Sequence, residues 1–245
     1  MSLFHHQDLV VHPQYQELTP YLQALPQLFA QGQGEVIHNG RNQLRKFTWN
    51  GKEYVAKSYH RPHFINQLVY GTIRPSKAKR AYENALLFQQ LGVGTPQPVG
   101  YLTIRKGLLF DQSYFVTEAS LCQVDFGILM TTEVPYMDEV LKEVARTTAV
   151  LHSNGYRHLD YGRGNILFRL DEEQKVQLDV IDLNRVAVGK VDVKSGCKNF
   201  ERLPATPHMH KVMADTYAAL RGFDKEECYT LMKAYRTADK GKEEY

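Results

Sequence analysis

The stretch that decides the fold is His158-Leu-Asp160-Tyr-Gly-Arg-Gly-Asn165, which has the spacing H-x-D-x-x-x-x-N. This spacing is typical of the catalytic loop of a phosphotransferase. An aspartate at the start of such a loop can orient an acceptor hydroxyl and accept its proton, and an asparagine farther along can bind a metal ion on the phosphates. We therefore predict that Asp160 is the catalytic base and Asn165 a metal ligand, and that His158 braces the loop through a hydrogen bond.

The segments around this loop favour the same interpretation. A long amphipathic helix is expected over residues 137–154, and the apolar runs at 166–168 and 176–183 form a hairpin around an acidic turn. The second run ends in Val180-Ile-Asp-Leu-Asn184, so that Asp182 is delivered beside the loop as a second magnesium ligand. An isolated aspartate there could also simply cap a strand end. Arg163 could contact the transferred phosphate or the acceptor, and an ordinary surface role is about equally compatible with its position.

The first half of the chain predicts an antiparallel sheet covered by one helix. Tight-turn signals at Asn39-Gly40 and Asn50-Gly51 separate the first three strands. A helix is expected over residues 76–91, with Ser76 as its N-cap and Gly92 ending it. The five strands are expected at residues 35–38, 43–49, 53–59, 98–104 and 108–118.

Four residues of this half are candidates for binding a nucleotide. Lys57 lies on the third strand, and Glu83 in the following helix could pair with it and hold it on the α- and β-phosphates, or be an exposed helix residue. A full glycine-rich loop is absent. Gly40 could let backbone amides approach the phosphates, or belong to an ordinary hairpin turn. Adenine is expected against the backbone of residues 116–120, which include Glu118. ATP and Mg²⁺ are the cofactors that these residues imply.

The order of strand lysine, helix glutamate, H-x-D-x-x-x-x-N and strand-terminal aspartate resembles the protein-kinase-like fold. The details are similar to the bacterial Kdo/WaaP lipopolysaccharide kinase family: Ala78-Lys-Arg-Ala-Tyr-Glu83, Gly92-Val-Gly-Thr-Pro96, and Asp182-Leu-Asn184 in place of D-F-G. The resemblance covers about residues 35–190. It implies ATP-dependent phosphorylation of a sugar hydroxyl, on Kdo or heptose of the lipopolysaccharide inner core, and hence a glycolipid acceptor such as Kdo-bearing lipid A.

Two departures separate the chain from regulated protein kinases. Leu159 replaces the arginine of the H-R-D motif, so an activation-loop phosphate would lack its usual partner, and no Ala-Pro-Glu follows Asp182. Both favour a small or lipid-linked acceptor. A kinase for a soluble small molecule or for protein remains an alternative, as does a pseudokinase that only binds. The complete set of Lys57, Glu83, Asp160, Asn165 and Asp182 counts against the last.

We therefore expect an α+β, two-lobed, protein-kinase-like fold. Residues 1–34 are expected to form an N-terminal arm, residues 35–118 an N-lobe with the five-stranded sheet and one helix, and residues 119–245 a small, mainly helical C-lobe. The hinge is expected near residues 118–124. Two further helices are expected around residues 211–221 and 224–237.

Composition limits the partners. The 245 residues are 43% hydrophobic and carry a net charge of only +3, so no field for a polyanion is implied and nucleic acid is not expected. The cysteines Cys122, Cys197 and Cys228 are widely separated, which favours a reducing compartment and no zinc site. No signal peptide or bilayer-spanning segment is apparent, so a cytoplasmic protein is expected.

A basic segment could bring this protein to a membrane. Residues 57–80 carry lysines, arginines and histidines interleaved with aromatic and aliphatic side chains and contain no acidic residue. Such a segment could bind an anionic glycolipid or the headgroups of the inner membrane, giving a peripheral location on its inner face. A solvated basic face is nearly as compatible with this composition.

Overall fold

The computed structural model describes residues 5–59, 75–106 and 109–243. The chain divides into two compact units. Unit 1 consists of Met1–Leu86 and Pro96–Ser120, and unit 2 of Leu87–Thr95 and Leu121–Tyr245. Most of the basic segment, residues 60–74, lies outside the described residues, so the predicted membrane or glycolipid contact there stays a prediction.

Unit 1 is built on one antiparallel sheet in the order β1-β5-β6-β4-β3-β2. Its strands are β1 (His5–Val11), β2 (Glu35–Asn39), β3 (Gln43–Trp49), β4 (Lys52–Tyr59), β5 (Pro98–Lys106) and β6 (Leu109–Glu118). The turn between β3 and β4 has positive φ angles at Asn50 (48°) and Gly51 (77°), the backbone that an Asn-Gly hairpin turn requires. The last five of these strands confirm the sequence prediction.

The sheet has six strands, and the predicted count of five is therefore wrong. The missing strand is β1, which pairs along its whole length with β5. It is followed by a 3-10 helix η1 (Pro13–Leu18) and a helix α1 (Thr19–Ala30), so the described residues of the predicted arm are part of unit 1. The many prolines and glutamines of residues 1–34 obscure the apolar pattern, so β1 and α1 cannot be predicted from the sequence. Pro26 lies inside α1, a position that normally disfavours a helix, and burial of α1 against the sheet compensates for it.

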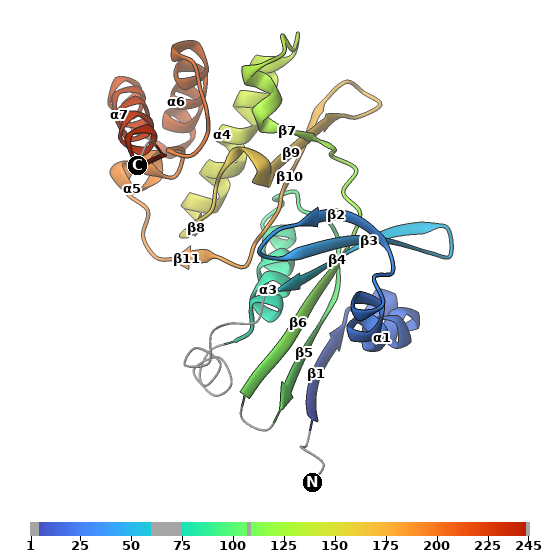
Figure 1. Cartoon of the computed structure of the whole chain (residues 1–245). Helices are drawn as coiled ribbons and strands as arrows, with labels where there is room; N and C mark the ends of the chain where they lie inside the picture. The colour runs from blue at the N-terminus through green and yellow to red at the C-terminus, as the bar shows by residue number, and fades with distance from the viewer. Residues whose placement is uncertain (1–4, 60–74, 107–108, 244–245) are drawn as a thin grey trace. The chain divides into compact units, whose positions relative to one another are not determined.

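Helices α1 and α3 cover opposite faces of the sheet (Figure 1). Side chains of η1 and α1, including Leu18, Leu22 and Leu25, share a core with one face of β4, β5 and β6. Helix α3 (Lys77–Gln90) packs on the other face, beside Tyr59 and Tyr101. The predicted N-cap is confirmed, because the Ser76 hydroxyl accepts a hydrogen bond from the Lys79 N–H at 3.0 Å.

Unit 2 is mainly helical, as predicted. Its elements are β7 (Val124–Asp125), η2 (Phe126–Met130), α4 (Met137–Ser153), β8 (Tyr156–His158), η3 (Arg163–Asn165), β9 (Ile166–Leu170), β10 (Val176–Val180), β11 (Val186–Val188), α5 (Val193–Lys198), α6 (Pro207–Arg221) and α7 (Lys225–Glu243). The predicted long helix and hairpin are confirmed as α4 and β9–β10. Helix α5 was not predicted, and α6 begins earlier than expected because Thr206 caps it and Pro207 occupies its first turn.

A short turn after α3 belongs to unit 2 because it packs on the β9–β10 hairpin. The Val180 N–H donates to the Gly94 carbonyl at 2.8 Å. A Cβ atom on Gly94 would lie 1.9 Å from the Leu178 carbonyl oxygen, so only glycine allows this approach of the two backbones. This contact fixes the strand that leads to Asp182.

Candidate active site

His158 holds the catalytic loop to the segment that carries Asp182. Its Nδ1 accepts the Asp160 N–H at 3.2 Å, and its Nε2 donates to the carbonyls of Ile181 and Asp182, at 3.1 and 3.2 Å. These partners require the neutral Nε2–H tautomer, and burial lowers the pKa of His158, which favours the neutral ring. The ring therefore braces the loop, as predicted from the sequence.

Asp182 and Asn165 are fixed by the backbone around them. Asp182 follows β10 with a φ of 60°, a left-handed conformation that aspartate tolerates better than most residues. The Ile181 N–H donates to the Asn165 carbonyl at 3.0 Å, and the Asn184 side-chain amide donates to the Asp182 carboxylate. The end of β10 and the end of the catalytic loop are thus joined to each other.

The two predicted metal ligands suit magnesium. The Asn165 Nδ2 donates to the Asp160 carbonyl at 2.8 Å, so Oδ1 is the atom that this side chain can offer to a cation. Mg²⁺ is usually bound by one or two protein oxygens together with waters and substrate phosphates. The donor set of Asn165 and Asp182 matches this pattern. Within the described part of the chain, no group of three or more His, Cys, Asp or Glu side chains could hold a metal by itself.

The Asp160 carboxylate is paired with two arginines that sequence analysis did not identify. Arg185 contacts its two oxygens at 3.0 and 3.2 Å, and Arg202 contacts Oδ1 at 3.0 Å. Strand pairing explains the first contact: β11 pairs with β8, Val186 lies opposite His158, and the Leu159 N–H donates to the Arg185 carbonyl. The only sequence signal for Arg185 is its position next to Asp182-Leu-Asn184. The pair with Arg202 bridges 42 positions of sequence and has no such signal.

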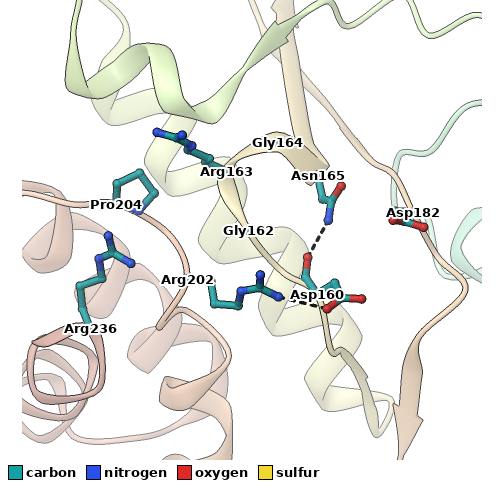
Figure 2. Close-up of a pocket in the computed structure, with 9 residues that line it drawn as sticks. All are labelled: Asp160, Gly162, Arg163, Gly164, Asn165, Asp182, Arg202, Pro204 and Arg236. Carbon is teal, nitrogen blue, oxygen red and sulfur yellow. Dashed lines mark hydrogen bonds and ion pairs between the residues drawn. The ribbon is translucent and has the colours of Figure 1, made fainter. Parts of the chain in front are cut away.

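Asp160 and Arg202 lie on one pocket of unit 2, which has a volume of about 520 Å³. Its lining residues are Asp160, Gly162, Arg163, Gly164, Asn165, Asp182, Arg202, Pro204 and Arg236. In Figure 2, Asp182 lies to one side of Asp160, and the three arginines lie to the other. The structure therefore brings together the four predicted site residues of this unit: Asp160, Arg163, Asn165 and Asp182.

A buried polar network extends from this loop into the helices of unit 2. The Asn199 Nδ2 donates to the His158 carbonyl at 2.8 Å, and its Oδ1 accepts from the His152 Nε2 at 3.0 Å. The other ring nitrogen of His152 accepts from the Tyr217 hydroxyl at 2.8 Å. Burial lowers the pKa of His152 to about 4, which keeps the ring neutral at pH 7. Helices α4 and α6 thereby support the catalytic loop.

Unit 1 contains the predicted lysine and glutamate. Side chains alternate along β4, so half-buried Lys57 lies on the same face as Tyr59, the face that α3 covers. Its ammonium lies 5.3 Å from the centroid of the Tyr59 ring. Glu83 is largely exposed on α3 and forms an ion pair with Lys79 at 3.9 Å. The pairing of Lys57 with Glu83 stays a prediction.

Gly40 and Glu118, the other predicted nucleotide-binding residues, form hydrogen bonds or ion pairs with neighbouring residues of unit 1. The Gly40 N–H donates to the Asn42 carbonyl at 3.2 Å within the β2–β3 turn, which favours the ordinary hairpin interpretation. The Glu118 N–H donates to the Gln97 carbonyl at 2.9 Å, and its carboxylate contacts the Tyr15 hydroxyl and the Lys52 ammonium. Adenine binding by the backbone of residues 116–120 stays a prediction.

Comparison with known structures shows the fold class of this chain. A structure described as WaaP in complex with acyl carrier protein matches with a TM-score of 0.65 and 19% identity, over 94% of this chain and 98% of that chain. A Rio2 kinase complex with ADP/Mg²⁺-phosphoaspartate from Chaetomium thermophilum matches with a TM-score of 0.50 and 16% identity, over 91% of this chain and 77% of that one. The fold is protein-kinase-like.

The family follows from the sequence. The model of the lipopolysaccharide kinase (Kdo/WaaP) family matches residues 28–235, so the chain belongs to that family. It is accordingly a phosphotransferase with an alcohol group of lipopolysaccharide as acceptor. A search of curated proteins finds no match to this sequence. Among the described residues, no helix has the length and apolar character needed to cross a bilayer.

Proposed function

We propose that this protein transfers the γ-phosphate of ATP, in the presence of Mg²⁺, to a hydroxyl of Kdo or heptose in the lipopolysaccharide inner core. The observation that carries the proposal is the bracing of the loop by His158, which gathers Asp160, Asn165 and Asp182 on one pocket. We further propose that the enzyme acts from the cytoplasm, at the inner face of the inner membrane, where a lipid-linked acceptor would be presented.

The proposed roles follow the chemistry of each side chain. Asp160 orients the acceptor hydroxyl and accepts its proton. The hydroxyl oxygen bonds to the γ-phosphorus, the bond from that phosphorus to the bridging oxygen breaks, and ADP leaves with the electron pair. Asn165 and Asp182 would hold magnesium, which neutralises phosphate charge when bound. Lys57 would contribute positive charge to the α- and β-phosphates, with Glu83 as its partner.

The test is mass spectrometry of a Kdo-bearing lipid A precursor after incubation with enzyme, ATP and magnesium. The wild type should add one phosphate. Asp160→Asn should lower the transfer rate at least about 100-fold, because general-base contributions are of about 10²–10⁴, while ATP binding stays within a factor of about two. Glu173→Gln, at an exposed position of the β9–β10 turn, is the matched control and should behave as the wild type.

Two results would contradict the proposal. A normal transfer rate in Asp160→Asn would remove the base role from Asp160. Intact ATP binding without transfer to Kdo-bearing or heptose-bearing acceptors would keep the fold and reject the sugar hydroxyl as acceptor.

A further inference from the structure

The pocket at Asp160 carries more positive charge than the transfer step itself explains. Three arginines line it, Arg163, Arg202 and Arg236, against the two carboxylates of Asp160 and Asp182. They come from three different parts of unit 2: η3, the segment between α5 and α6, and α7. Guanidinium groups that converge from separate elements on one pocket are suited to bind an oxyanion.

The arginines lie on the side of Asp160 opposite to Asp182 (Figure 2). Asp182 and Asn165, the proposed magnesium ligands, mark the side of the nucleotide phosphates. The arginine side is therefore the side from which the acceptor hydroxyl approaches the base. An oxyanion bound there would belong to the acceptor and not to ATP.

Arg202 forms an ion pair with the proposed base Asp160. Its Nη1 lies 3.0 Å from Asp160 Oδ1, the same oxygen that Arg185 contacts at 3.0 Å. A hydroxyl that donates its proton to this oxygen must compete with these two guanidinium groups. The Arg202 side chain is 51% exposed, and exposed ion pairs are weak enough to be exchanged for a better-oriented anion.

Arg236 holds the segment that carries Arg202 by a hydrogen bond. Its Nη1 donates to the Glu201 carbonyl at 3.2 Å, so α7 holds the residue just before Arg202. Gly162 of the catalytic loop lies against the same segment, where a Cβ atom would be 3.9 Å from the Arg202 Cβ. The hydrogen bond to Glu201 thus fixes the backbone next to Arg202, and the half-exposed Arg202 side chain is the part that can change partner.

We propose that the acceptor carries an oxyanion close to the hydroxyl that is phosphorylated, and that Arg202 leaves Asp160 to bind it, together with Arg163 and Arg236. The inference rests on the proposed function and adds a specificity rule: an acidic acceptor releases the base for its own hydroxyl, and a neutral acceptor does not. The oxyanion is a carboxylate of a sugar acid or a phosphate carried by the lipid.

The test compares acceptors that differ only in this charge. Steady-state transfer is measured on a Kdo-bearing lipid A precursor, on the methyl ester of its Kdo carboxylate, and on its dephosphorylated form. We expect the intact acceptor to be used about 10- to 100-fold better than the form that has lost the bound oxyanion, the value of one charge-assisted hydrogen bond. Loss on esterification assigns the carboxylate, and loss on dephosphorylation assigns the lipid phosphate. Equal use of all three acceptors would overturn the inference.

Variants locate the effect. Arg202→Gln should raise the KM for the intact acceptor about 10- to 100-fold and leave the KM for ATP unchanged. It should also abolish the preference for the intact acceptor over the form that lacks the bound oxyanion. Arg146→Gln, an exposed arginine of α4 outside the pocket, is the matched control. A rise in the KM for ATP in Arg202→Gln would assign the arginine to the nucleotide and overturn the inference.

A binding measurement separates this inference from the proposed function. Calorimetry without ATP compares free Kdo with its methyl ester, and inorganic phosphate serves as the second anion. Anion binding that is lost in Arg202→Gln, with no transfer to any sugar, would uphold the oxyanion site and reject the proposed reaction. Transfer without a preference for acidic acceptors would uphold the proposed reaction and reject the oxyanion site.

Discussion

Acidification should destabilise unit 2 through His152, a buried member of the polar network. His152 is 2% exposed, and burial lowers its pKa to about 4 from an unfolded value of 6.5. The unfolded chain therefore binds more protons than the folded chain between these two pH values. The stability that the neutral ring provides is complete above pH 6.5 and is lost as the pH falls toward 4.

The magnitude follows from the two pKa values. A difference of about 2.5 units corresponds to about 3 kcal/mol over the whole window, and to about 2 kcal/mol between about pH 7.5 and about pH 5. His158 is also buried with a lowered pKa and acts in the same direction. Its contribution is common to the wild type and to a variant at His152, so the comparison isolates His152.

The perturbation is His152→Gln, in which an amide nitrogen can still donate to Asn199 Oδ1 but does not titrate. Urea unfolding is followed at both pH values by a hydrogen-exchange pulse and mass spectrometry of α4 peptides. The wild type should lose about 2 kcal/mol more than the variant on acidification. His208→Gln, at an exposed histidine of α6, is the control and should retain the wild-type acid sensitivity. Equal losses in the wild type and His152→Gln would refute the argument.

Two further substitutions test the fold. Gly94→Ala would place a Cβ atom 1.9 Å from the Leu178 carbonyl oxygen and should destabilise unit 2 by more than about 3 kcal/mol in urea unfolding. The control is Gly164→Ala, which has open space around its Cβ position and should lower the stability by less than about 1 kcal/mol. Tyr15→Phe removes the hydroxyl that contacts Glu118 and should lower the stability of unit 1 by about 1–2 kcal/mol. Unfolding is measured by the fluorescence of the single tryptophan. Unchanged stability would show that this contact contributes nothing.

Local patterns explain why much of the fold was predictable. Some features depend on only a few neighbouring residues and can therefore be predicted from the sequence. They are the turn at Asn50-Gly51, the N-cap at Ser76 and the amphipathic spacing of α4. Strand β1 and helix α1 depend on a distant partner instead. Strand β1 exists because β5, about ninety residues later, offers a free edge, and α1 exists because the sheet provides an apolar face.

The site divides in the same way. The spacing of His158, Asp160 and Asn165 and the strand before Asp182 predict a phosphotransferase loop without any knowledge of the fold. The charges that face Asp160 follow from the tertiary structure. Arg185 arrives through the pairing of β11 with β8, and Arg202 arrives from a segment more than forty residues away. Because a charge acts through distance in space and not along the chain, no spacing rule could have assigned either arginine to Asp160.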